Sequence, residues 1–193
     1  MIKYSNRKAI MTQKQINRLY IEGEIRKVSD GNIQKFLFAC IDKFPEYFWT
    51  VPASVRDYHP EDEREEGGLV LHVRRLCKLT DDIVRMYELN MWERDILLSS
   101  CILHDAFSRG IPPNVRKSSD QLHPIYPEIM FPYNAFADRY IKDRRIYDEI
   151  MECVVSHMGR FSVSQSLRSN KKLPMLFHMM DYISSRTYIR IEL

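Results

Sequence analysis

One stretch of sequence decides the fold: WERDILLSSCILHD, residues 92–105. From Trp92 to Leu103 it is apolar around most of its circumference, which is typical of a helix buried by other helices on every side. The stretch ends in His104 and Asp105. An ionised aspartate is unfavourable there, because desolvation and the negative end of the helix dipole both oppose its charge. A bound cation removes both objections, so the stretch predicts a central helix that ends in metal ligands.

Apolar residues at helical spacing recur on both sides of this stretch, and no alternating strand pattern of any length occurs. Helices are expected near residues 16–20, 33–41, 69–89, 124–141, 144–158 and 173–189, with loops at 46–66, 106–122 and 159–172. The sequence therefore predicts one all-α structural unit. Its N-terminal helices, within residues 1–45, are expected to pack on a core formed by residues 46–193.

Composition excludes several classes of protein. The 193 residues include 29 Lys and Arg and 26 Asp and Glu, a net charge of +3, which excludes a disordered polyelectrolyte and a strongly basic nucleic-acid coat. The four cysteines are scattered, so free buried thiols are expected rather than disulfides or a Cys-rich zinc site. No apolar run approaches the ~20 residues that span a bilayer, and no signal core follows the basic N-terminus. We therefore expect a soluble, cytoplasmic protein with no membrane partner.

Four more residues of metal-ligating type lie on apolar helices or near helix ends. They are His72 in GGLVLH, His123 in QLHP, His157 in VVSHMG and Asp181 in MMDYI. Imidazole and carboxylate are ligands for Mn, Fe, Co, Ni and Zn. The alternative is that these residues are unrelated, but an isolated Asp181 would then be buried without a partner, which is costly.

The order of these residues resembles the H…HD…H…H…D signature of the HD-domain metal-dependent phosphohydrolases. The similarity runs over about residues 48–190 and implies an HD-domain helical bundle. It also implies one or two divalent transition metal ions (Mn, Fe, Co, Ni or Zn). One metal would be held by His72, His104, Asp105 and Asp181. His123 and His157 would complete a second site, with Asp105 bridging the two.

Catalytic and substrate-binding roles follow from the same resemblance. Asp105 is expected to act in catalysis with Arg109, although many family members carry Lys three residues after the dyad Asp, where this chain has Ser108. The candidate contacts for substrate phosphate are Arg75, Arg160 and Arg186. Arg75 lies three residues after His72 and therefore shares its helix face.

The expected activity is hydrolysis of a phosphoester or phosphoanhydride of a nucleotide or short oligonucleotide by a metal-activated water. Residues 48–72 are similar to the HD part of YhaM-type 3′-to-5′ exoribonucleases, so an exoribonuclease-like phosphodiesterase acting on short RNA ends is one alternative. The six-ligand set is also similar to HD hydrolases that cleave diadenosine tetraphosphate symmetrically. A non-catalytic nucleotide-sensing HD module is another alternative, but such modules usually lose ligands. A homodimer is left open.

Overall fold

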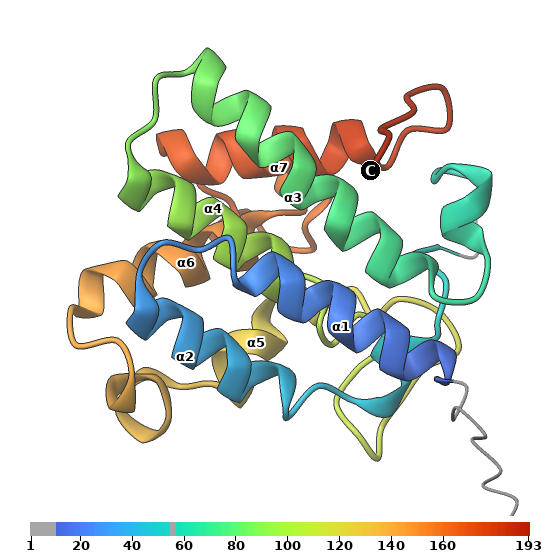
Figure 1. Ribbon diagram of the computed structural model, residues 1–193, viewed down its shortest axis with the longest axis horizontal. Helices are drawn as coiled ribbons and strands as arrows, with labels where there is room; N and C mark the ends of the chain where they lie inside the picture. The colour runs from blue at the N-terminus through green and yellow to red at the C-terminus, as the bar shows by residue number, and fades with distance from the viewer. Residues whose placement is uncertain (1–10, 55–56) are drawn as a thin grey trace, which may run out of the picture.

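The computed structural model describes residues 11–54 and 57–193, and in these residues the chain is helical without a strand (Figure 1). The α-helices are α1 (Gln13–Ile25), α2 (Gly31–Ile41), α3 (Gly68–Met86), α4 (Met91–Leu103), α5 (Tyr126–Met130), α6 (Arg144–Ser156) and α7 (Lys172–Ser184). Short 3-10 turns join them, among them η1 (Glu46–Trp49), η2 (Glu61–Arg64) and η3 (His123–Ile125). The all-α prediction is confirmed.

The predicted central helix, α4, is buried along most of its length. Its N-terminus is fixed by a capping box, in which the Asn90 side chain accepts from the Glu93 backbone N–H and the Glu93 side chain accepts from that of Asn90. Every residue from Asp95 to Leu103 is buried. The helix packs against α1, α2, α3, α6 and α7. This burial holds the end of α4, with the His104–Asp105 pair, at the centre of the molecule.

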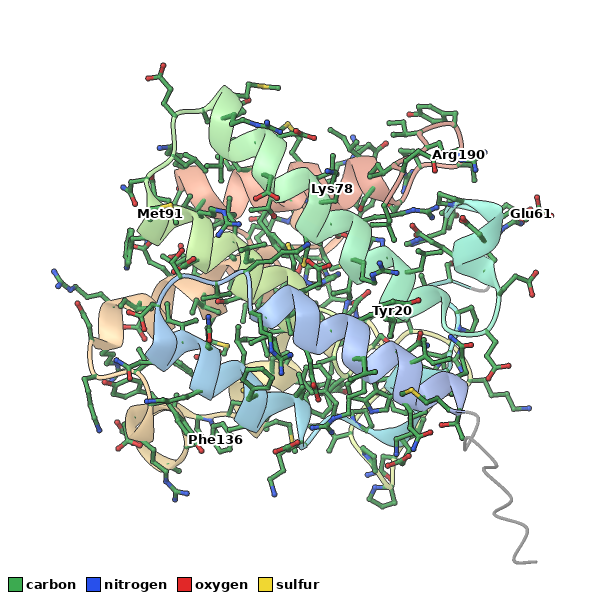
Figure 2. The ribbon with its side chains drawn as sticks, viewed as in Figure 1. Tyr20, Glu61, Lys78, Met91, Phe136 and Arg190 are labelled. Atoms are coloured by element: carbon green, nitrogen blue, oxygen red, sulfur yellow. The ribbon has the colours of Figure 1, made fainter. Side chains whose placement is uncertain are left out.

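A single hydrophobic core joins the N-terminal helices to the remainder of the chain. It runs from Ile21 in α1 to Met180 in α7. The ring of Phe36 in α2 contacts Phe136, with centroids 6.1 Å apart, and Figure 2 shows Phe136 below α2. Since α1 also packs on α3 and α4, the first helices cover one side of the bundle (Figure 1).

Several predicted elements have different bounds in the structure. The helix expected over 124–141 reduces to η3, α5 and two single 3-10 turns. Pro127 lies in the first turn of α5, and Pro132 prevents the helix from continuing past Met130. The helix expected over 69–89 ends at Met86, and the last helix ends at Ser184 rather than near Ile189. The expected loop at 46–66 contains η1 and η2.

The described cysteines are all free and buried: Cys40, Cys77, Cys101 and Cys153. This agrees with the expectation of buried thiols. None of the helices in the described part of the chain combines the length and the apolar character that crossing a bilayer requires.

Candidate metal centre

The structure brings all six predicted ligands together. His72 lies in the second turn of α3 and Asp181 lies in α7, whereas His104 caps the C-terminus of α4 and His157 that of α6. Two ligands lie outside the α-helices: Asp105 follows α4, and His123 begins η3. The ligands form two groups that we call the helix half (His72, His104 and Asp181) and the loop half (Asp105, His123 and His157).

In the helix half, one carboxylate oxygen faces two imidazoles. Asp181 Oδ1 lies 3.1 Å from His72 Nε2 and 3.8 Å from His104 Nε2. Both histidines are almost completely buried, and Asp181 is mostly so. Three ligand atoms therefore converge at the junction of α3, α4 and α7.

In the loop half, Asp105 Oδ1 lies 3.0 Å from His123 Nε2 and 3.9 Å from His157 Nε2. The Nε2 atoms of these two histidines are 3.0 Å apart. The second oxygen of Asp105, Oδ2, lies 3.5 Å from His104 Nε2 in the helix half. Asp105 therefore directs one oxygen to each half.

Hydrogen bonds at Nδ1 fix the orientation of three of the four histidines. The acceptors are the backbone carbonyls three residues earlier: Cys101 O for His104 (2.9 Å), Asp120 O for His123 (2.5 Å) and Val154 O for His157 (2.7 Å). A carbonyl oxygen only accepts, so each Nδ1 carries the proton. In the neutral rings Nε2 is then a bare lone pair, and it is Nε2 that faces the other ligands.

This donor set fits a cation. The facing Nε2 lone pairs of His123 and His157 repel each other at 3.0 Å unless a proton or a metal ion lies between them. His104 Nε2 is buried and has no hydrogen-bond partner among the described residues. A buried, unsatisfied nitrogen is costly, and a metal ion removes that cost. The buried His and Asp groups of both halves could hold a metal ion.

Glu63 is a member of the site that the sequence did not indicate. It is completely buried, and its Oε2 lies 2.8 Å from His59 Nδ1 and 3.3 Å from His72 Nδ1. Its carboxylate therefore faces His72 on the side opposite Asp181, although His72 Nδ1 makes no hydrogen bond in the described residues, unlike the Nδ1 atoms of the other three histidines. Gly68 permits this approach, because a Cβ there would lie 1.9 Å from the carbonyl oxygen of Glu63.

Arg75, predicted to contact substrate phosphate, is engaged elsewhere. Its guanidinium donates to Glu63 Oε1 at 2.8 Å, to both oxygens of Asp62, and to the backbone carbonyl of Ile191. It is 5% exposed. The prediction is corrected: helical spacing does place Arg75 on the side of His72, but these bonds use its donors to secure Glu63. Figure 2 shows this end of the molecule, where Glu61 in η2 and Arg190 in the C-terminal segment lie on the same side.

A third group of metal-ligating type is formed by His59, Glu63 and His72. Arg75 affects whether this group could bind a cation. The guanidinium charge already compensates the Glu63 carboxylate, which disfavours a second cation at the same oxygens. Glu63 is therefore better explained as support for His72 than as a ligand.

The pKa shifts follow the same pattern in the two halves: each half contains one histidine whose pKa is raised (His72, His123) and one whose pKa is lowered (His104, His157). Burial opposes a charge on His72, but the carboxylates of Asp181 and Glu63 on either side raise its pKa well above 6.5. Burial, with the nearby His123 and His104, lowers the pKa of His157 to about 4. Burial likewise opposes ionisation of Glu63, yet the neighbouring His59, His72 and Arg75 lower its pKa to about 2. Without a metal, each half therefore combines a histidine that favours its charged form, a histidine that favours its neutral form, and an aspartate whose pKa is lowered.

The other predicted arginines have no carboxylate partner among the described residues. Arg160 is exposed in the turn after α6, and Arg186 is partly buried just after α7. Arg109 is partly buried, and its backbone N–H donates to the Tyr47 hydroxyl at 3.2 Å. Burial lowers the pKa of Arg109. Their predicted roles toward substrate stay predictions.

No protein-family model, curated protein or solved structure matches this chain.

Proposed function

We propose that this protein is a metal-dependent phosphohydrolase of the HD-domain type, which cleaves a phosphoester or phosphoanhydride bond in a nucleotide or short oligonucleotide. The observation that carries the proposal is the placement of Asp105. Its two oxygens face separate groups of imidazole nitrogens, 3.0 Å from His123 Nε2 on one side and 3.5 Å from His104 Nε2 on the other. One carboxylate between two sets of ligands is suited to bridging two cations.

His72, His104, Asp105 and Asp181 would hold one divalent metal, and Asp105, His123 and His157 a second. When bound, such ions lower the pKa of a coordinated water and offset charge on the phosphoryl group. The imidazole-rich donor set favours Mn, Fe, Co, Ni or Zn over Mg, which prefers oxygen ligands.

The protein's own contribution is positioning. The Nδ1 hydrogen bonds keep each Nε2 aimed inward, and the burial of α4 keeps Asp105 between the halves. The Tyr47 hydroxyl accepts from the Arg109 N–H and donates to the Gly110 carbonyl at 2.7 Å, which anchors the turn after Asp105. Arg109, free of any carboxylate in the described structure, is the nearest cation in sequence to Asp105. We propose that it contributes positive charge toward the substrate phosphate.

The test is metal analysis of the purified protein together with a substrate panel. Mono-, di- and cyclic nucleotides, dinucleoside polyphosphates and short RNA would be offered with each metal in turn. We expect turnover of at least one nucleotide-like ester that disappears on chelation and returns with a transition metal. Activity that survives exhaustive chelation and desalting contradicts the proposal. Absence of turnover across the panel by metal-loaded protein favours a nucleotide-sensing module instead.

A further inference from the structure

Beside the metal centre, aromatic rings and guanidinium groups from three separate segments of the chain stack one after another in space. The members of this aromatic–arginine column are, in spatial order, Arg160, Phe161, Tyr182, Arg186 and Tyr58. They come from the turn after α6, from the end of α7 and the residues after it, and from the segment before η2. The metal centre, as proposed above, does not use the aromatic members.

The contacts within the column are stacking contacts. The rings of Phe161 and Tyr182 are 8° from parallel, with centroids 6.1 Å apart. That spacing is within the ~4.5–7 Å range of offset stacking, in which part of each face is left uncovered. The Arg186 guanidinium lies 4.3 Å from the centroid of Tyr182 and 6.0 Å from that of Tyr58. At the other end the Arg160 guanidinium lies 4.8 Å from the Phe161 centroid.

Core packing does not account for the column. Phe161 is 52% exposed and Tyr58 is 54% exposed, so neither ring has been removed from water as a core aromatic is. Arg160 and Arg186 make no ion pair in the described residues, whereas ten other arginines there do pair with carboxylates. Arg186 donates only to the Tyr182 carbonyl and the Ser185 hydroxyl, which leaves N–H groups for an anion.

The column is attached to the metal ligands themselves. Tyr182 follows Asp181 in α7, and its ring lies 6.5 Å from that of His178, whose Nδ1 is 2.5 Å from the His157 carbonyl. At the opposite end Tyr58 precedes His59, whose ring contacts that of His72 at 4.9 Å. Both halves of the metal centre are therefore connected to the column through one or two residues.

Gly159 fixes one part of this arrangement. Its φ of +48° belongs to the left-handed region, and a Cβ there would lie 2.3 Å from His178 Nε2. The chain can therefore turn sharply after His157 and bring Phe161 alongside Tyr182. A side chain at position 159 would separate the turn from α7.

We propose that the aromatic–arginine column binds a nucleobase of the substrate while its arginines meet the adjoining phosphates. This inference rests on the proposed function, because it supplies the specificity for the phosphoester that the metal centre would cleave. Every base has a flat π face, and stacking on exposed aromatic side chains is the usual means of holding one without reading its sequence. Guanidinium groups stack on bases and bind phosphate, so alternating rings and arginines suit a ligand in which bases alternate with phosphates.

The experiment compares two ligands that differ only in their bases. One is a diadenylate with a phosphorothioate linkage, which resists hydrolysis, and the other is its counterpart with both bases replaced by hydrogen. Calorimetry on the full-length, Mn²⁺-loaded protein measures both affinities. We expect the diadenylate to bind at least about tenfold more tightly, in line with the usual contribution of a stacked base.

Substituted variants test whether the column causes the difference in affinity between the two ligands. Phe161→Ala should reduce the preference for the diadenylate about tenfold and leave the base-free affinity within twofold, whereas Phe161→Trp should retain the preference. Tyr87→Ala is the matched control, since Tyr87 is 43% exposed at the end of α3. Arg160→Gln should lower the affinity for both ligands by the same factor. Arg139→Gln, at another exposed arginine, should leave both affinities unchanged. Thermal unfolding verifies that each variant is folded.

The outcomes separate this inference from the proposed function. Equal affinity for the two ligands, no binding of either, or an unchanged preference in Phe161→Ala overturns the column as a base-binding surface, even if phosphoesters are hydrolysed. If Phe161→Ala abolishes a base-dependent affinity, the column is supported as a base-binding surface. If the metal-loaded protein showing that affinity hydrolyses no phosphoester, the proposed function is contradicted.

Discussion

The helix half and the loop half of the candidate metal centre use the same ligand types but support them differently. In the helix half, His72 lies against the Glu63 carboxylate, which is itself held by Arg75, while His104 is held by a backbone carbonyl. In the loop half, His123 and His157 are held by backbone carbonyls alone. The Glu63 support is ionisable and can be changed by one side-chain substitution. The carbonyl support is neutral and is changed only if the backbone moves.

The largest expected effect comes from the residue that the halves share. Asp105→Asn should reduce turnover by about 10³-fold or more, because charge stabilisation by both metals, worth several kcal/mol, depends on this carboxylate. Steady-state kinetics at saturating metal measures the loss. Asp148→Asn, at an exposed aspartate in α6, is the control. Near wild-type turnover in Asp105→Asn would remove the bridging role.

Separate substitutions in each half should give different metal contents. His72→Ala should lose the metal of the helix half and the increase in Tm that accompanies it, since binding to the native state adds to stability. His123→Ala should retain about one tightly bound metal per chain and a folded protein, while losing most activity. Elemental analysis and calorimetry of both variants, with wild type, measure this. A wild type that saturates at one metal, or a fully active His123→Ala, contradicts the two-metal arrangement.

Removing the ionisable support should affect only the helix half. Glu63→Gln should weaken the metal there by about 10- to 100-fold, the usual effect of losing a partner that orients a ligating histidine. Glu61→Gln, two residues earlier and exposed, should change nothing. Competition with a chelator gives the two affinities in each variant. If Glu63→Gln weakens both metals equally, the halves are not independent.

The smallest expected effect is a difference in pH dependence of the metal-free protein. The pKa of His157 is lowered from 6.5 to about 4, so its contribution to stability is complete above pH 6.5 and is lost as pH falls toward 4. The pKa of His72 is raised well above 6.5, so its contribution is complete below pH 6.5 and is lost as pH rises through the raised value.

Denaturant unfolding of chelator-treated protein from pH 4 to 8 tests this difference. We expect His157→Gln to flatten the acid side of the stability profile, and His72→Gln to flatten the alkaline side. Similar changes on the same side of the profile would contradict the opposite pKa shifts of His72 and His157.

The sequence was sufficient to predict which six His and Asp residues lie together, partly from local signals and partly from the resemblance in their order. His104 and Asp105 end an unusually apolar helix, and Asp181 interrupts an apolar one, so both positions are unfavourable for a charge without a partner. Their order then matched a known motif. The assembly of these residues into one site depends on helix packing, which the burial of α4 enforces.

Glu63 could not be predicted in the same way. It lies in the acidic run at residues 61–66, which indicates a solvated surface, and its burial depends on partners distant in sequence. Arg75 reaches it from the next helix, and Gly68 lets its backbone approach. The shared helix face of His72 and Arg75 is the one local signal for this contact, and from the sequence alone it is equally compatible with a substrate phosphate and with a buried acid.

The carbonyl acceptors at Cys101, Asp120 and Val154 have a consequence for how the sequence can change over time. A backbone oxygen is offered by any residue, so positions 101 and 154 are free to drift among side chains that fill the same volume without altering the hydrogen bond to the histidine. The network of Glu63, Arg75 and Gly68 has no such freedom, because each side chain, or its absence, is part of the contact. Related chains should therefore vary at the positions whose backbone carbonyls hold His104 and His157, and change around Glu63 only in concert.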